Sequence, residues 1–96
     1  MAYALVVDQP VTMEDYRKLL DVVGSEQPAG RLFHAFGPFE GGLRFIDVWE
    51  SREHARAFER DRLLPAYAQV FGGQQMQPPK MAELDVEVYG IPSSSA

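Results

Sequence analysis

Residues Gly41–Arg56, GGLRFIDVWESREHAR, combine a turn, a strand and the start of a helix. The Gly-Gly pair that opens the stretch tolerates positive φ at both positions, which suits a tight hairpin turn. Leu43–Glu50 is rich in β-forming residues and predicts a strand. Ser51 can then cap a helix that begins near Arg52. The stretch therefore predicts a hairpin whose second strand leads directly into a helix.

Large apolar side chains occur on both faces of this strand. Successive side chains of a strand point to opposite faces, so Phe45, Asp47 and Trp49 share one face while Ile46 and Val48 share the other. This pattern predicts a central strand that is covered on both sides. Asp47 lies between two aromatic residues, so its carboxylate needs a partner or a wet cavity.

The rest of the chain supplies three more strands and one more helix. The expected elements are a strand Ala2–Asp8, a helix from Thr12 to Gly24, a strand Arg31–Glu40, a helix from Arg52 that bends at Pro65 and continues over Ala66–Phe71, and a last strand Met81–Ile91. Gly37-Pro38 is expected to end regular pairing of its strand. Residues 1–91 are predicted to form one domain, followed by a disordered tail, Pro92–Ala96.

The element order strand, helix, strand, strand, helix, strand predicts an α+β protein. It is the ferredoxin-like βαββαβ arrangement, a four-stranded antiparallel sheet with two helices on one face. The other face would be bare, and it is expected to carry Phe36, Phe45 and Trp49. Such an aromatic patch exceeds what a soluble monomer usually exposes. The sequence therefore predicts a homodimer that forms through the open sheet faces.

Composition argues against several classes of protein and partner. The chain of 96 residues has no cysteine, which excludes disulfides and thiol chemistry, and its two histidines show no metal-ligand spacing. A net charge of -5 works against nucleic acid as a partner. No apolar run approaches the roughly 20 residues of a membrane helix, and the N-terminus does not resemble a signal peptide. We expect a cytoplasmic protein without a metal and without a membrane or nucleic-acid partner.

The element order and the stretch GGLRFIDVWESREHARAF resemble the dimeric α/β-barrel superfamily, in particular its small antibiotic-biosynthesis-monooxygenase-like members. The resemblance covers Ala2 to Tyr89. It implies a dimeric α/β barrel with a ligand pocket between sheet and helices. It also implies oxidation of a small aromatic or polyketide-like metabolite without a cofactor. The haem-degrading and polyketide-oxidising branches use an asparagine, and this chain has none. The alternative is a non-catalytic dimeric module that binds a small molecule or serves a stress response.

Two titratable residues are the candidates for proton transfer. Histidine is the side-chain type best suited to proton transfer near neutral pH, so His34 could take a proton from a phenol or an activated carbon acid. It could equally be a partly buried histidine bonded to a neighbour. Asp47 could orient His34 or accept a substrate hydroxyl, and its alternative is an ion pair with Arg44 or with an arginine across the dimer.

Five aromatic residues are the candidates for binding a small aromatic ligand, and Tyr89 is one of the weaker ones. Trp49 could stack on a flat ring, or it could simply pack in the core or at an interface. Phe36, Phe45 and Tyr67 are weaker candidates of the same kind. Whether the protein is an enzyme at all is left open by the sequence.

Overall fold

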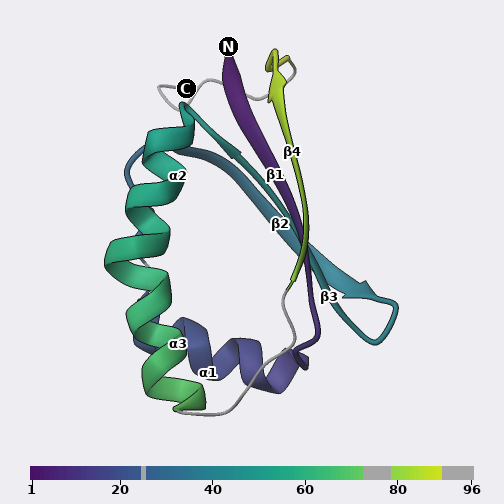
Figure 1. Ribbon diagram of the computed structural model, residues 1–96, viewed down its shortest axis with the longest axis vertical. Helices are drawn as coiled ribbons and strands as arrows, with labels where there is room; N and C mark the ends of the chain where they lie inside the picture. The colour runs from purple at the N-terminus through teal and green to yellow at the C-terminus, as the bar shows by residue number, and fades with distance from the viewer. Residues whose placement is uncertain (25, 73–78, 90–96) are drawn as a thin grey trace.

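The computed structural model describes residues 1–24, 26–72 and 79–89. In chain order the elements are β1 Ala2–Gln9, α1 Met13–Val23, β2 Arg31–Phe39, β3 Gly42–Trp49, α2 Arg52–Phe58, the π-helical segment η1 Glu59–Leu63, α3 Leu64–Phe71 and β4 Lys80–Val86. Helices and sheet form two layers, with the helices on one face of the sheet (Figure 1). The predicted ferredoxin-like α+β fold is confirmed. Within the described ranges, no helix is both long enough and apolar enough to cross a membrane.

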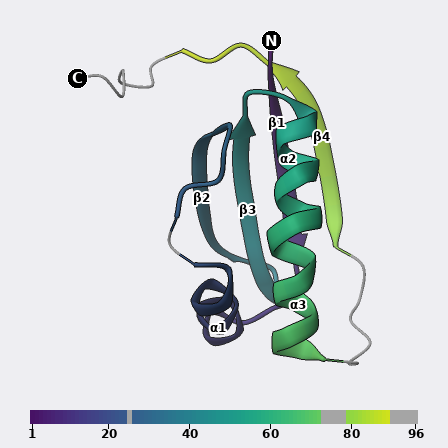
Figure 2. The same cartoon turned by 90° about the vertical axis from the view of Figure 1, so that its left-hand side faces the viewer.

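The four strands form one sheet in the order β2-β3-β1-β4, and every neighbouring pair is antiparallel. β3 is central, as its apolar composition predicts, while β2 and β4 are the edges. Figure 2 shows α1 and the α2–α3 column in front of the sheet. No described element covers the opposite face, so it is the helix-side face that can enclose a ligand.

The first helix begins and ends where the sequence predicts. The Thr12 hydroxyl accepts a hydrogen bond from the Asp15 backbone N–H at 3.0 Å and caps the helix. Gly24, at φ 91°, adopts the positive φ that ends it. Tyr16 and Leu19 are the buried residues of α1, and both face the sheet side of the molecule.

The second helix differs from the prediction of a bend at Pro65. The column is interrupted earlier, by η1, where the Leu64 N–H donates to the Glu59 carbonyl one residue further back than in an α-helix. Pro65 then lies in the first turn of α3 and does not end the helical column. In Figure 2, α2, η1 and α3 therefore follow one another as one continuous column.

The β2–β3 hairpin also corrects two predictions. Pairing does not end at Gly37-Pro38, because Pro38 pairs with Leu43 and Phe39 with Gly42. A proline is compatible with this strand because β2 is an edge of the sheet. The two positive φ angles of the turn belong to Glu40 (44°) and Gly41 (82°). Gly42 instead lies in β3, where an added Cβ would be 2.1 Å from the Gln9 carbonyl oxygen.

The last strand is shorter than predicted. β4 ends at Val86, and Glu87–Tyr89 is not part of a strand. The final predicted strand residue, Ile91, and the predicted tail, Pro92–Ala96, lie outside the described residues. Within β4 the alternation holds, and Glu83 lies on the helix side, where it accepts a hydrogen bond from the Tyr3 hydroxyl at 2.5 Å.

The three aromatic residues expected on the bare face lie on the other one. Phe36, Phe45 and Trp49 all face the helices, and Phe45 and Trp49 are only 9% and 2% exposed. Phe45 packs with Tyr16, and Trp49 packs with Ala55. The prediction of their location was wrong because alternation shows which side chains share a face but not which face the helices cover.

The bare face is nevertheless apolar. The sheet register places on it the side chains that alternate with those of the helix side. Its most exposed large members are Phe33 (43%), Phe39 (38%), Ile46 (42%) and Leu84 (50%). A contiguous group of this kind is unusual on a protein that stays monomeric.

Candidate functional site

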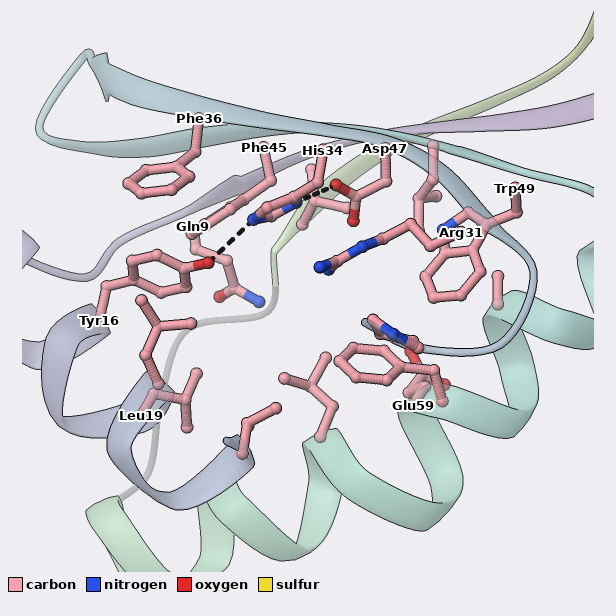
Figure 3. Close-up of a pocket in the computed structure, with 18 of the residues that line it drawn as sticks. Gln9, Tyr16, Leu19, Arg31, His34, Phe36, Phe45, Asp47, Trp49 and Glu59 are labelled. Carbon is pink, nitrogen blue, oxygen red and sulfur yellow. Dashed lines mark hydrogen bonds and ion pairs between the residues drawn. The ribbon is translucent and has the colours of Figure 1, made fainter. Parts of the chain in front are cut away.

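A cavity of about 290 Å³ lies between the helix-side face of the sheet and the helices. Figure 3 shows its walls, which come from the strands above and from α1 and the α2–α3 column below. The lining is largely apolar, and its polar side chains are few. Those that bear on the chemistry are Tyr16, Arg31, His34, Asp47, Trp49 and Tyr67. A mostly apolar cavity with a few converging polar groups is typical of a small-molecule site.

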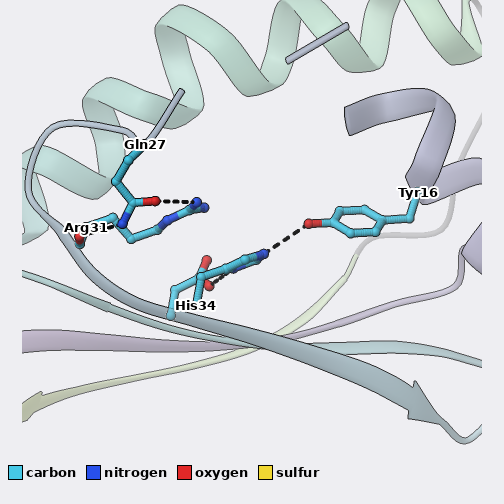
Figure 4. A network of polar contacts seen from close by, with 5 residues as sticks. Tyr16, Gln27, Arg31 and His34 are labelled. Carbon is cyan, nitrogen blue, oxygen red and sulfur yellow. Dashed lines mark hydrogen bonds and ion pairs between the residues drawn. The ribbon is translucent and has the colours of Figure 1, made fainter. Parts of the chain in front are cut away.

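Three of these side chains form a continuous hydrogen-bonded chain. The Tyr16 hydroxyl lies 3.0 Å from Nε2 of His34, and Nδ1 of His34 contacts Oδ1 of Asp47 (Figure 4). His34 and Asp47 are register partners on β2 and β3. Because an ionised carboxylate only accepts, the proton of the neutral imidazole is placed on Nδ1, and Nε2 accepts from Tyr16. Of the partners considered for Asp47 from the sequence, His34 is the one that it contacts in this structure.

The alternative partner predicted for Asp47 is engaged elsewhere. Arg44 projects from the opposite face of β3 and forms a two-pronged ion pair with Asp8, with nitrogen–oxygen distances of 2.7 and 2.8 Å. An Asp47–Arg44 ion pair is therefore not present in this structure. The carboxylate of Asp47 instead lies on the cavity side of the sheet, where its contact with the His34 ring holds that ring in one orientation.

Tyr16 holds its proton firmly in this environment. Burial, and after it the negative charge of Asp47, raises the pKa of Tyr16 to about 12. At neutral pH the phenol is therefore protonated and donates to His34. Tyr16 was not among the site residues predicted from the sequence, so its role as a polar partner was missed. The signal that could have found it is a hydroxyl on an otherwise apolar helix face that packs against the strand of His34.

The raised pKa of Tyr16 predicts a loss of stability in alkali. The folded protein keeps the Tyr16 proton that the unfolded chain releases with a pKa of 10.0. The contribution of this group to the free energy of unfolding is therefore complete below pH 10 and is lost as the pH rises to about 12. A shift of this size corresponds to about 2 to 3 kcal/mol of unfolding free energy. Urea unfolding at several pH values measures it. Tyr16→Phe should lose less stability over this range, whereas Tyr89→Phe, at an exposed tyrosine, should behave like the wild type. Equal losses in wild type and Tyr16→Phe would contradict the assignment.

Arg31 is the main polar residue of the cavity that sequence reasoning missed. Plain alternation places Arg31 and His34 on opposite faces, but the register of β2 shifts between Arg31 and Phe33. This irregularity turns Arg31 to the helix side, where it lines the cavity. Burial lowers the pKa of Arg31 from its ordinary value, and the charge of Asp47 opposes that effect. No residue pattern within β2 announces such a bulge.

Gln27 holds the Arg31 side chain from the neighbouring loop. The Nη2 of Arg31 donates to Oε1 of Gln27, and Nε2 of Gln27 donates to the Arg31 carbonyl, both at 3.0 Å. Figure 4 shows the Arg31 guanidinium next to the Gln27 side chain and near the His34 ring. The Arg31 side chain is thus fixed before any ligand binds, which lowers the entropic cost of binding a ligand through it.

The aromatic candidates line the same cavity. The Tyr16 and Phe36 rings meet edge to face with centroids 4.5 Å apart, and the His34 ring stacks over Phe45 at 6.4 Å. At the other end, Trp49 packs on Phe58 with ring centroids 5.5 Å apart.

Tyr67 reaches the cavity from α3, and burial raises its pKa. The structure therefore brings six of the predicted site residues to one cavity: His34, Asp47, Trp49, Phe36, Phe45 and Tyr67. The weaker candidate Tyr89 is exposed and does not line this cavity. Their roles in binding or catalysis stay predictions.

Fold and cavity together define a class. This is a small ferredoxin-like α+β protein whose apolar cavity lies between one sheet face and its helices. No family model matches the chain, and no curated protein matches its sequence.

Solved structures do match. A presumed antibiotic biosynthesis monooxygenase from Chloroflexus aurantiacus has 20% sequence identity and a TM-score of 0.64, over 96% of this chain and 100% of that one. A monooxygenase of Streptomyces coelicolor, solved with nanaomycin D, has 19% identity and a TM-score of 0.63, over 96% and 93%. A Nitrosomonas europaea protein of unknown function has 12% identity and a TM-score of 0.70, over 97% and 96%. At these identities the similarity establishes the fold, and the resemblance predicted from the sequence is confirmed at that level.

Proposed function

We propose that the protein binds a small hydroxylated aromatic metabolite and oxidises it with dioxygen without a cofactor. The observation that carries this proposal is the chain of hydrogen bonds from Tyr16 through His34 to Asp47, which enters an otherwise apolar cavity. The solved complex of the Streptomyces coelicolor monooxygenase with nanaomycin D supports the choice of ligand class.

The hydrogen-bonded chain provides a path for one proton. The Tyr16 oxygen accepts the proton of a ligand hydroxyl or activated carbon while its own proton passes to Nε2 of His34. The resulting imidazolium is stabilised by the Asp47 carboxylate in a cavity that is largely shielded from water. The raised pKa of Tyr16 fits this role, because the tyrosine passes a proton on without ever remaining a phenolate.

The deprotonated ligand is rich in electrons and can reduce dioxygen directly. One electron passes to dioxygen, and recombination of the two radicals forms a carbon–oxygen bond and a peroxide. Return of the stored proton to the outer peroxide oxygen gives a hydroperoxide. Loss of the remaining proton from the same carbon then forms the carbonyl as the oxygen–oxygen bond breaks, and this proton leaves with the departing hydroxide as water. Overall, a ring methylene and dioxygen become a ring carbonyl and water, so the carbon supplies all the electrons that dioxygen takes up.

Oxygen uptake tests the proposed reaction. Hydroxylated naphthalenes and anthrones are incubated with the purified protein in an oxygen electrode, and products are identified by their mass. We expect Tyr16→Phe, which keeps the ring but removes the hydroxyl of the proton path, to slow uptake strongly. The matched control is Tyr89→Phe, because Tyr89 is exposed and outside the cavity. Uptake that is absent with every compound, or unchanged in Tyr16→Phe, would reject the proposal.

A second candidate is a binding module without turnover. It is favoured by the fact that both ring nitrogens of His34 already have protein partners. Native mass spectrometry of the purified protein separates the two functions. A stoichiometric aromatic adduct together with no oxygen uptake would favour the module, whereas uptake that depends on Tyr16 would reject it.

We further propose that the protein is a homodimer whose bare sheet faces pack together. The exposed residues Phe33, Ile46 and Leu84 on that face support this assembly. At about 25 cal/mol per Å², covering a few hundred Å² of apolar surface per subunit would stabilise the association by several kcal/mol. The two sheets would then form the barrel that the resemblance implies.

The substitution Ile46→Asp is expected to convert the dimer to a monomer. Ile46 is 42% exposed near the middle of the central strand, so a charge there would be buried without a partner in the dimer. Light scattering coupled to gel filtration measures the mass. Leu64→Asp, at a residue 56% exposed on α3, should leave the dimer intact. Dissociation by Leu64→Asp alone would place the interface on the helices instead.

A further inference from the structure

We propose that the aromatic ligand of this cavity carries a carboxylate, and that Arg31 binds it. This inference deepens the proposed function and rests on its small-molecule site. It adds the substrate class, an aromatic acid with a hydroxyl group, to the general aromatic ligand argued above. The evidence is the charge and the unused hydrogen-bonding capacity of one wall of the cavity.

Arg31 carries a positive charge that the described part of the chain leaves without a salt bridge. Across residues 1–24, 26–72 and 79–89, the ion pairs within 4.0 Å involve other cations. The terminal nitrogen Nη2 bonds to the neutral amide of Gln27, and the buried Nε has no hydrogen-bond partner. Arg31 is half-buried, and a half-buried cation without a counterion is less stable than a paired one, so a ligand carboxylate would supply both the charge and the acceptor.

A second donor lies beside Arg31. Trp49 is its register partner on β3, and the indole Nε1 is also buried without a partner. Figure 3 shows the Arg31 side chain extending along the cavity wall next to Trp49 and ending near His34 and Asp47. Two N–H groups without partners on neighbouring strands add to the positive potential of this wall of the cavity, which favours an anion there.

The acidic residues of the cavity do not neutralise Arg31. Asp47 offsets part of the Arg31 charge, but its carboxylate contacts His34 and forms no ion pair with the guanidinium within 4.0 Å. Glu26 and Glu59 also line the cavity, but both are exposed, so solvent screens their charges. The site at Arg31 therefore still favours an anion.

The two polar groups of the cavity fit two ends of one ligand. The Tyr16 hydroxyl, at the end of the hydrogen-bonded series, accepts the hydroxyl group of the ligand, and Arg31 binds its carboxylate. The apolar lining contacts the ring between these two groups. The bulge in β2 is what allows this arrangement, because it brings Arg31 to the same face as His34. A regular strand would have placed the guanidinium on the bare face of the sheet.

Isothermal titration calorimetry with matched ligands tests this inference. The probes are a hydroxynaphthoate, the corresponding neutral hydroxynaphthamide and the corresponding naphthol, each titrated into the full chain at neutral pH. We expect the acid to bind the wild type at least about 10-fold more tightly than the amide, since a charge-assisted pair is roughly twice as strong as a neutral one. Arg31→Gln should abolish this preference and leave the affinity for naphthol unchanged.

Two further variants make the comparison specific. Arg17→Gln removes an exposed arginine of α1 outside the cavity and should keep the preference for the acid. Arg31→Met retains the apolar stem of the arginine side chain. It is used in place of Arg31→Gln if Arg31→Gln does not fold. Equal binding of acid and amide by the wild type would overturn the inference, and so would a preference that survives the loss of the Arg31 charge.

The outcome is separable from that of the oxidation test. Acid binding that depends on Arg31 but is accompanied by no oxygen uptake would support this site and reject the proposed reaction. Oxygen uptake with neutral phenols, together with no preference for acids, would support the reaction and reject this site.

Discussion

Replacing His34 with alanine is expected to slow turnover of a hydroxylated aromatic by about 10²- to 10⁴-fold, the usual contribution of a positioned general base. The substitution removes the acceptor of the Tyr16 proton and leaves that phenol, with its pKa of about 12, unable to take a proton from the ligand. The value of kcat should fall more than KM changes, because the imidazole stabilises charge that develops during the reaction. Steady-state oxygen uptake measures both constants.

The second histidine provides the control for this experiment. His54 contacts Ser51 at the start of α2 and does not line the cavity, so His54→Ala should leave kcat nearly unchanged. Turnover that survives His34→Ala would contradict the proton path.

The role of Asp47 is tested through His34. Asp47 acts by positioning the imidazole, so Asp47→Asn combined with His34→Ala should be no slower than His34→Ala alone. A double variant in which the two losses add would show that Asp47 acts independently of His34.

Replacing Trp49 with alanine is expected to lower the free energy of unfolding by about 3 to 5 kcal/mol. Trp49 is 2% exposed and forms one of the two buried clusters together with Tyr3 and Ala55. Its removal would enlarge the ligand cavity, and the surrounding β1, β3 and α2 could collapse only partly. Since the free energy of unfolding of a small domain is about 5 to 15 kcal/mol in total, this loss is a large part of its stability.

Urea unfolding followed by far-ultraviolet circular dichroism measures this effect, because the substitution also removes the only tryptophan. Leu64→Ala deletes a side chain that is 56% exposed on α3 and should cost less than about 1 kcal/mol. A cost below about 1 kcal/mol for Trp49→Ala would mean that the side chain belongs to a mobile ligand site rather than to the core.

Much of the fold could be predicted because the local patterns in the chain are strong. The apolar run of β1, the cap of α1 and the stretch from β3 into α2 each lie within a residue or so of their predicted bounds. That Asp47 could reach His34 was inferred from the two neighbouring strands of one hairpin, with an arginine ion pair as the alternative. These features depend on short-range sequence alone.

The remaining features depend on contacts between distant parts of the chain. Tyr16 joins the site because α1 crosses β2, and no spacing within the helix indicates which strand it meets. The aromatic residues of β3 were placed on the wrong sheet face because both faces are apolar. Arg31 was missed because a bulge breaks the alternation on which the prediction depends.

The π-helical segment Glu59–Leu63 makes the cavity sensitive to the length of the chain. A helix advances about 100° per residue, so a single deletion within η1 that restored a regular α-helix would rotate everything after it by that angle. The hydroxyl of Tyr67 would turn away from the cavity, and Ala66, now 1% exposed, would be replaced at the core by a neighbour. Homologous chains that share this cavity should therefore keep the spacing between their second helix and their aromatic residue on α3, even where the residues in between vary freely.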